Sequence, residues 1–259
     1  MTTKSPAVRQ FTVHHDGVTI PVTRGGQGRP LVFVPGLTST QAELHELLAL
    51  LRRDFDVLSF DLRGHGMSSA AATYNFAAFL ADLTAVLASP QTPAAPILAG
   101  HSLGADLIVH YAAAHPVAEL VLIDGANPIP EPFITDLDLP QFRTLWADAA
   151  RWHETHRGTE RQVLLTAQQI LDLNLELDVL RAELLTRYRG IDCPIHLIAS
   201  TAMAGDSADG RVPRHNRLWR AGIDRLVAAR PRLTPVWLDA SHGLVLTHAP
   251  EIAQILRDL

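Results

Sequence analysis

The amino-acid sequence predicts an α/β fold with a mostly parallel central sheet and helices on both faces. Short apolar runs of strand length alternate with longer amphipathic stretches of helical length between residues 31 and 123, and the alternation returns after residue 194. Parallel strands joined by crossover helices produce this order, with helices covering both faces of the sheet. A chain of 259 residues is also long enough to bury a substantial core.

The first half of the chain begins with a hairpin. Residues 9–24 alternate in polarity, and Asp16-Gly17 is a dipeptide typical of a two-residue hairpin turn. After this hairpin we expect strands at residues 31–34, 56–60, 96–99 and 119–123. Between them we expect helices at residues 41–53, 75–88 and 103–114. Ligands of such sheets bind at the carboxyl ends of the strands.

A proline-rich segment at residues 127–132 ends this alternation. Its three prolines continue neither a helix nor a strand, so we expect the chain to leave the core there. Over residues 133–189, apolar residues fall near helical spacing and no strand-like run occurs. The core pattern then returns with a strand at 194–199, a helix at 214–229, a strand at 234–238 and a last helix from Ala249.

Composition argues against several classes of protein. The formal net charge of −5 argues against a nucleic-acid partner, because phosphates require a basic face. No apolar run is long enough to span a bilayer, and residues 1–6 lack the apolar stretch of a signal peptide, so we expect a cytoplasmic protein without membrane attachment. Cys193 is the only cysteine, which excludes an internal disulfide and a thiolate cluster; we expect no metal site.

The pentapeptide Gly-His-Ser-Leu-Gly at residues 100–104 has the pattern G-x-S-x-G. It follows the strand expected at 96–99 and precedes an expected helix, which is the context that this nucleophile motif needs. The serine of such a turn takes a strained backbone conformation that lifts its hydroxyl above the sheet edge, and the glycines let strand and helix pass closely. Ser102 is therefore the candidate nucleophile.

Four motifs, in this order, resemble those of the α/β-hydrolase superfamily. They are the apolar run and Pro-Gly-Leu at residues 31–37, the strand and Asp-Leu-Arg-Gly-His-Gly-Met-Ser turn at 57–68, the elbow at 100–104 and Ser-His-Gly at 241–243. The resemblance covers nearly the whole chain and implies an α/β-hydrolase fold, with residues 1–128 and 190–259 as the core. It also implies that residues 129–189 form a helical cap, or lid, over the nucleophile, and that no cofactor is needed.

The resemblance also implies roles for residues around Ser102. His242 lies in a loop after a late strand, where this fold delivers the base that a serine hydroxyl needs at neutral pH. The backbone N–H groups of Leu103 and Leu37 are expected to form the oxyanion hole. Gly36 is expected to let the backbone approach the acyl oxygen.

The acid that orients His242 is ambiguous in the sequence. Most relatives carry it directly after the strand at 194–199, but residues 200–204 of this chain contain no acid. Asp206 and Asp209 follow in a loop and can serve only if this loop folds inward. Asp124, one strand earlier, is the residue that we favour, since haloalkane dehalogenases and zearalenone-type lactonases carry their acid there. An acid at either strand end can hold the tautomer of the histidine.

Aromatic residues of the expected cap predict an apolar substrate pocket, as is common for small-molecule sites. The candidates from cap and core are Gly36, Phe133, Phe142, Leu145, Trp146, Trp152 and Met203. The aromatic residues can alternatively serve only to pack the cap on the core. No cluster of arginines is placed convincingly in the sequence for a phosphate or a carboxylate.

These residues predict a cofactor-free serine hydrolase that cleaves a carboxylic ester or lactone of a medium-sized apolar molecule through an acyl-enzyme. Thioesterase and carbon–carbon bond hydrolase activities use the same residues and stay open. A non-hydrolytic small-molecule-binding protein is the alternative from another class, although it need not retain both Ser102 and His242. Beyond its small-molecule substrate, we expect a monomer or homodimer.

Overall fold

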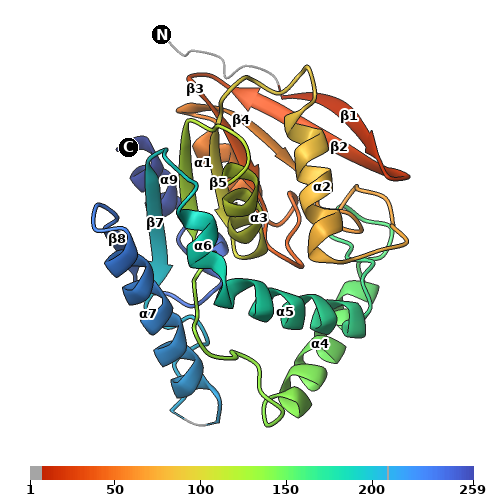
Figure 1. Cartoon of the computed structure of the whole chain (residues 1–259). Coiled ribbons are helices and arrows are strands. Elements are labelled where there is room, and N and C mark those ends of the chain that lie inside the picture. Colours follow the sequence, from red (N-terminus) through yellow and green to blue (C-terminus); the bar gives the residue numbers. More distant parts are fainter. Residues whose placement is uncertain (1–7, 209) are drawn as a thin grey trace.

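The computed structural model describes residues 8–208 and 210–259, which contain an eight-stranded sheet (Figure 1). The strands are β1 (Arg9–His15), β2 (Val18–Gly26), β3 (Arg29–Val34), β4 (Phe55–Phe60), β5 (Ile97–His101), β6 (Glu119–Ile123), β7 (Ile195–Ser200) and β8 (Pro235–Leu238). Their order across the sheet is β1-β2-β4-β3-β5-β6-β7-β8. The pairs β1–β2 and β2–β4 are antiparallel and the others are parallel, so the predicted mostly parallel sheet is confirmed.

Helices cover both faces of this sheet. They are α1 (His45–Leu51), α2 (Phe76–Leu87), α3 (Leu103–Ala112), α7 (Val212–Ala229), α8 (Leu244–Thr247) and α9 (Ala249–Arg257). Successive residues of a strand point to opposite faces. Accordingly, Val32 and Val34 share a buried cluster with residues of α2, α3 and α7, whereas Leu31 and Phe33 share one with α1, α8 and α9.

Local sequence signals explain where several elements begin and end. Asp16 and Gly17 take φ values of 49° and 72°, which the tight turn between β1 and β2 requires. Asn75 caps α2, since its side-chain oxygen accepts the N–H of Ala78 at 2.9 Å. The helix expected from residue 41 begins only at His45, because a tight turn held by Glu43 precedes it. The short α8 was not expected, and its four residues are too few for periodicity to reveal.

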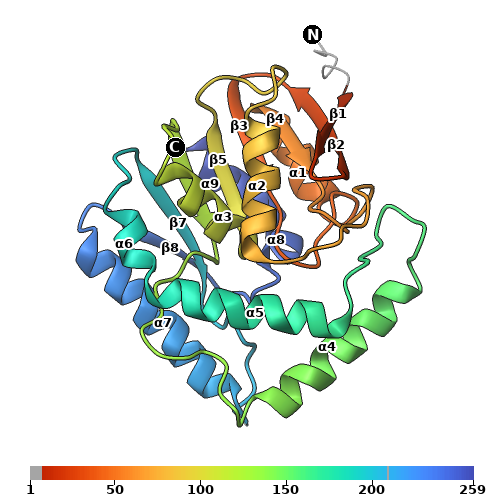
Figure 2. The ribbon, with the colours of Figure 1, turned by 45° about the vertical axis from the view of Figure 1, so that its right-hand side comes forward.

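The segment between β6 and β7, residues 129–189, is here called the β6–β7 insertion. It forms α4 (Leu139–Glu154), α5 (Ala167–Ala182) and α6 (Leu184–Tyr188). Figure 2 shows α5 running across the molecule below the sheet, with α4 beside it. α4 packs against α5 around a small buried cluster of Ile134, Phe142 and Leu171. The insertion therefore lies at the edge of the sheet where the parallel strands end.

No helix within residues 8–208 and 210–259 has the length and apolar character needed to cross a membrane. Residues 1–6, from which we predicted that a signal peptide is absent, lie outside the described part of the chain.

Candidate active site

The turn after β5 carries Ser102 at the start of α3. Ser102 has φ 52° and ψ −120°, a backbone conformation that is strained for a residue with a Cβ atom. Glycine is needed at position 104, because a Cβ there would lie 2.1 Å from the carbonyl oxygen of Val34. Strand, turn and helix together fix the Ser102 hydroxyl at the carboxyl edge of the sheet.

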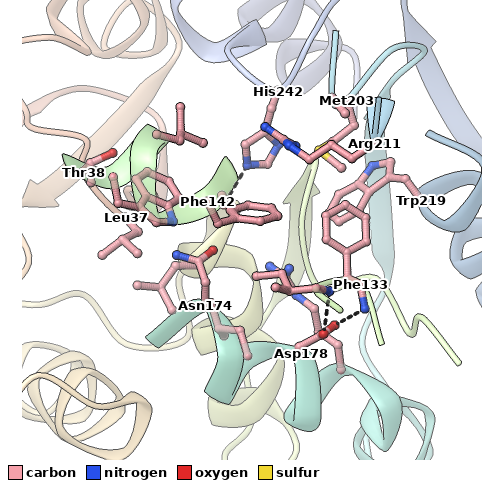
Figure 3. A pocket seen from close by; sticks show the side chains of 18 residues that line it. Leu37, Thr38, Phe133, Phe142, Asn174, Asp178, Met203, Arg211, Trp219 and His242 are labelled. Atoms are coloured by element: carbon pink, nitrogen blue, oxygen red, sulfur yellow. Dashed lines mark hydrogen bonds between the residues drawn. The ribbon is translucent and has the colours of Figure 1, made fainter. Parts of the chain in front are cut away.

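His242 reaches Ser102 from the loop between β8 and α8. Its Nε2 lies 2.8 Å from Oγ of Ser102, and its Nδ1 lies 2.7 Å from Oδ2 of Asp124 (Figure 3 shows the first of these contacts as a dashed line). With Nδ1–H donating to the carboxylate, Nε2 is left to accept the serine proton. His101 fixes this loop, since its Nε2 donates to the carbonyl oxygen of His242 at 2.9 Å. Burial, together with the charge of His242, lowers the pKa of His101 to about 3, so His101 stays neutral.

Asp124 is buried at the carboxyl end of β6. Its two oxygens accept four hydrogen bonds, from the N–H and hydroxyl of Ser200 at 3.0 and 2.8 Å, from Nε1 of Trp219 at 2.9 Å and from His242 at 2.7 Å. Burial by itself would raise the pKa of this carboxyl. The hydrogen bond and charge of His242 and the two bonds from Ser200 outweigh burial and hold the pKa of Asp124 below its usual value, so it stays ionised.

Of the two alternative acids, the structure describes only Asp206, which does not contact His242. Asp206 is exposed on the loop after β7, while Nδ1 of His242 is already bonded to Asp124. Asp209 lies outside the described residues. The structure thus brings Ser102, His242 and Asp124 together from three separate stretches of chain.

The loop after β3 passes close to the Ser102 turn. A Cβ on Gly36 would lie 2.8 Å from Nδ1 of His101 and 3.1 Å from Cβ of Ser102, so this approach requires glycine. Within residues 8–208 and 210–259, no hydrogen-bond acceptor is found for the backbone N–H of Leu37 or Leu103. Both residues line the space beside Ser102, where their donors are available to a developing oxyanion.

The loop after β3 is also bonded to His65, through the backbone N–H of Thr38, the residue that follows Leu37. Thr38 has φ 65° and donates its N–H to Nε2 of His65 at 3.1 Å. The other nitrogen of His65 donates to the carbonyl oxygen of Arg63 at 2.9 Å, so both ring nitrogens are used only if the ring is neutral. Burial lowers the pKa of His65 to about 4 and favours that neutral form.

A cavity of about 300 Å³ opens beside Ser102 and His242 (Figure 3). The core contributes the apolar or small residues Leu37, Thr38, Leu103, Met203, Ala204 and Trp219, and the β6–β7 insertion contributes Phe133, Ile134, Phe142, Leu145, Trp146 and Leu177. Of the residues expected to line a pocket, Phe133, Phe142, Leu145, Trp146 and Met203 do so. Gly36 lies behind the wall, against the Ser102 turn.

The expected position of Trp152 in the pocket was wrong. Trp152 is 47% exposed, and its ring contacts that of His156 at a tilt of 40°, with ring centroids 4.2 Å apart. Six residues separate Trp152 from Trp146, which at 3.6 residues per turn is about 240° around the helix axis. The two tryptophans of α4 therefore point to different sides.

Four polar residues of the cavity wall were missed in the sequence: Asn174, Asp178, Arg181 and Arg211. Arg181 binds both carboxylate oxygens of Asp106, at 3.0 and 2.6 Å. Asp178 accepts the backbone N–H groups of Phe133 and Ile134 (Figure 3). A charged residue on an amphipathic helix usually faces solvent, and no local motif distinguishes these from that common case. Only the packing of α5 and α7 turns them toward the cavity.

The side chains around Ser102 can activate its hydroxyl, because His242 is placed to accept the proton. In the described part of the chain, no three His, Cys, Asp or Glu side chains gather closely enough to hold a metal. What the site does contain is a serine beside a histidine base, a buried carboxylate behind that base and free backbone donors. Such a set can attack a carbonyl carbon.

Residues 31–255 match the sequence model of the Alpha/beta hydrolase family. Among curated relatives, 2-(acetamidomethylene)succinate hydrolase of Mesorhizobium japonicum is 28% identical over 195 residues, which are 74% of this chain and 66% of that protein. N-formylmaleamate deformylase of Pseudomonas putida is 35% identical over 104 residues, 39% of this chain and 38% of that protein. The chain spans between 41% and 66% of the length of the first curated relatives it matches.

Solved structures show the same fold over almost the whole chain. The enol-lactonase of Burkholderia xenovorans superimposes with a TM-score of 0.67 at 20% identity, covering 96% of this chain and 98% of that one. A haloalkane dehalogenase of Bradyrhizobium elkani superimposes with a TM-score of 0.73 at 15% identity, covering 97% and 96%. At these identities the likeness concerns the fold alone.

Proposed function

The chain belongs to the alpha/beta hydrolase family, and we propose that it is a cofactor-free serine hydrolase acting on a carboxylic ester or lactone. One observation carries the proposal: the hydrogen-bonded row from Ser102 through His242 to Asp124, with contacts of 2.8 and 2.7 Å. This row ends at the wall of a cavity that is lined by both apolar and polar side chains. A buried carboxylate, a histidine and a serine in this order are the parts that acyl transfer needs.

In the proposed first half-reaction, Oγ of Ser102 attacks the carbonyl carbon while its proton passes to Nε2 of His242. The N–H groups of Leu37 and Leu103 stabilise the negative oxygen of the tetrahedral intermediate. When the carbon–oxygen bond to the leaving group breaks, His242 returns the proton to the departing oxygen. The acyl group is then esterified to Ser102, and in a lactone the alcohol stays attached to it.

Water completes the proposed cycle. His242 takes a proton from the water as its oxygen attacks the acyl-enzyme, and the proton then passes to Oγ of Ser102 as the acid leaves. Asp124 stays ionised throughout and stabilises the imidazolium, which the lowered pKa of this carboxyl supports. The four donors around Asp124 hold it in the orientation that this role requires.

We further propose that the β6–β7 insertion serves as the cap that selects the substrate. It supplies Phe133, Phe142, Trp146 and other apolar residues on the side of the cavity opposite the core. A volume of about 300 Å³ is at the lower end of small-molecule sites. This size favours a small acyl group over a long lipid chain.

A fluorophosphonate probe and an ester panel test the proposed function. The wild-type protein should be labelled covalently at Ser102 and should hydrolyse short p-nitrophenyl esters or lactones. Ser102→Ala should lose labelling and at least about a thousandfold in turnover, because removing a covalent nucleophile typically costs that much or more. Circular dichroism should show an unchanged fold. A wild-type protein that is folded, unlabelled and inactive on esters, lactones and thioesters, yet binds them, would instead be a small-molecule-binding protein.

A further inference from the structure

Arg211 brings a positive charge into the cavity. It stands at the N-terminal end of α7, and Figure 3 shows its side chain extending toward the space between His242 and Phe142. Its Cζ lies 4.6 Å from the centroid of the Phe142 ring, and its Nη1 lies 3.2 Å from Nδ1 of His215. Stacking on Phe142 covers one face of the guanidinium and leaves its N–H groups at the edge of the plane.

The other charges of the cavity wall are already matched. Arg181 is bonded through two nitrogens to the carboxylate of Asp106. Asp178 has two backbone N–H donors. Among the described residues, by contrast, no carboxylate lies within ion-pair distance of Arg211, whose neighbour His215 has a pKa lowered by burial. Apart from Nη1, which contacts His215, the N–H donors and the charge of Arg211 are thus not matched by a described side chain and are left for a ligand.

We propose that Arg211 binds a carboxylate on the substrate, at a point remote from the bond that is cleaved. This rests on the proposed function, which it narrows to an ester or lactone whose acyl group also carries a carboxylate. A guanidinium offers a carboxylate two parallel N–H donors, and such charged pairs are short and strong. Within the cavity, this pair selects an acidic substrate over a neutral one of equal size.

The apolar walls fit the rest of such a substrate. Phe142 and Trp146 from the insertion, with Met203 and Trp219 from the core, contribute apolar surface to the cavity that Arg211 and Ser102 both line, and Asn174 and Asp178 contribute polar atoms to the same wall. A methylene chain suits this space. The proposed substrate is therefore anionic at one end, has an ester carbonyl at the other and is apolar between them.

Matched pairs of esters test the proposal. The p-nitrophenyl monoesters of the six-, seven- and eight-carbon dicarboxylic acids carry a free carboxylate, and the corresponding amides replace it with a neutral group of similar shape. In at least one pair, wild-type kcat/KM should favour the carboxylate by about 10- to 100-fold, the range expected for a hydrogen bond to a charged group. Arg211→Met should reduce this ratio to near one, and Arg211→Lys should keep part of it.

Arg217→Met provides the matched control, since Arg217 is exposed on the same helix and its loss removes the same charge. This variant should keep both the activity and the ratio. A merely structural role of Arg211 would lower kcat/KM for both esters equally and leave the ratio unchanged, which would overturn the proposal. Equal wild-type kcat/KM in all three pairs would overturn it too.

A binding measurement separates this proposal from the proposed function. Calorimetric titration of Ser102→Ala measures binding without turnover. The ligands are the monomethyl esters of the same dicarboxylic acids, which keep one free carboxylate, and the matching esters in which an amide replaces that carboxylate. One outcome is that the wild-type protein hydrolyses no ester, yet the carboxylate ligands bind more tightly than the amides and Arg211→Met removes this difference in affinity. The proposed function then fails while the carboxylate site stands. If esters are hydrolysed without any preference for the acids, the function stands and the carboxylate site fails.

Discussion

The carboxyl edge of the core and the β6–β7 insertion meet at one cavity but are held in different ways. At the core edge, Ser102 and Asp124 follow buried parallel strands, and their backbones are fixed with positive φ values of 52° and 45°. The insertion has only a small buried cluster of its own. It is held to the core by apolar residues such as Leu165, Ile170 and Leu177, which join the main buried cluster, and by polar contacts such as Arg181 with Asp106.

This difference indicates separate roles for the two regions: the core edge carries out the catalysis, and the insertion selects the substrate. The core edge needs fixed geometry, because a base must stay within hydrogen-bond reach of its nucleophile. The side chains of the insertion that face the cavity, such as Phe142 and Trp146, can change without altering the strands that position Ser102. We expect substitutions at the core edge to lower turnover, and substitutions in the insertion to change which substrate binds.

The largest effect is expected at Asp124. Asp124→Asn should lower kcat by roughly 10²- to 10⁴-fold with little change in binding, because the amide favours the wrong tautomer of His242 and cannot stabilise imidazolium. Asp206→Asn and Asp209→Asn serve as controls and should stay near wild type. Steady-state kinetics of the three variants provides the check. An active Asp124→Asn enzyme, with one loop variant inactive, would transfer the role of the acid to that loop.

The stability of the fold should fall in acid because of His65. Its pKa is about 4 in the folded protein against 6.5 for an ordinary histidine, so the unfolded chain binds the proton first as the pH falls. The contribution of neutral His65 is complete above pH 6.5 and is lost toward pH 4, by roughly 3 kcal/mol in the free energy of unfolding.

Denaturant titrations across this pH range measure the effect. His65→Gln should flatten the dependence of unfolding free energy on pH, whereas His45→Gln, at an exposed position, should leave it unchanged. His65 also pairs through its backbone with Val163 of the insertion, so acid should weaken contact between the two regions. An unaltered pH dependence in His65→Gln would show that other groups, such as His101, account for the loss.

A smaller effect is expected from Ser200, which donates two hydrogen bonds to Asp124 but does not line the cavity. Ser200→Ala removes the hydroxyl donor and should lower kcat roughly tenfold while KM stays nearly constant. Thr201→Ala is the control, because the hydroxyl of Thr201 bonds to Asp239 away from the site. A rise in KM at constant kcat would place Ser200 in substrate binding instead.

The smallest effect should come from the two tryptophans of α4. Trp146→Ala removes part of the cavity wall and should raise KM by about three- to tenfold, which corresponds to the loss of roughly 0.7 to 1.4 kcal/mol of apolar contact. Trp152→Ala, on the exposed side of the same helix, should change KM little. Equal effects of both substitutions would mean that α4 acts through its stability and not through its cavity face.

Sequence patterns alone were enough to predict the sheet, the alternation of its helices, a helical segment after residue 132 and the candidates Ser102 and His242. It could do so because each of these depends on residues close together in the chain: apolar runs, turn residues and the G-x-S-x-G pattern. It left Asp124 and the loop acids open, because which carboxylate meets His242 depends on how β6, β7 and β8 lie side by side.

The cavity could not be predicted from the sequence. Arg181 lies on α5, whereas Arg211 at the start of α7 and Trp219 within it follow only after α6 and β7, and nothing in their local sequence relates them to Ser102. Trp152 is the opposite case: the sequence predicted that it lines the cavity, but it lies on the exposed side of α4. Side-chain direction on a helix and the packing of distant helices are set by contacts across the whole molecule, whereas motif and periodicity are local.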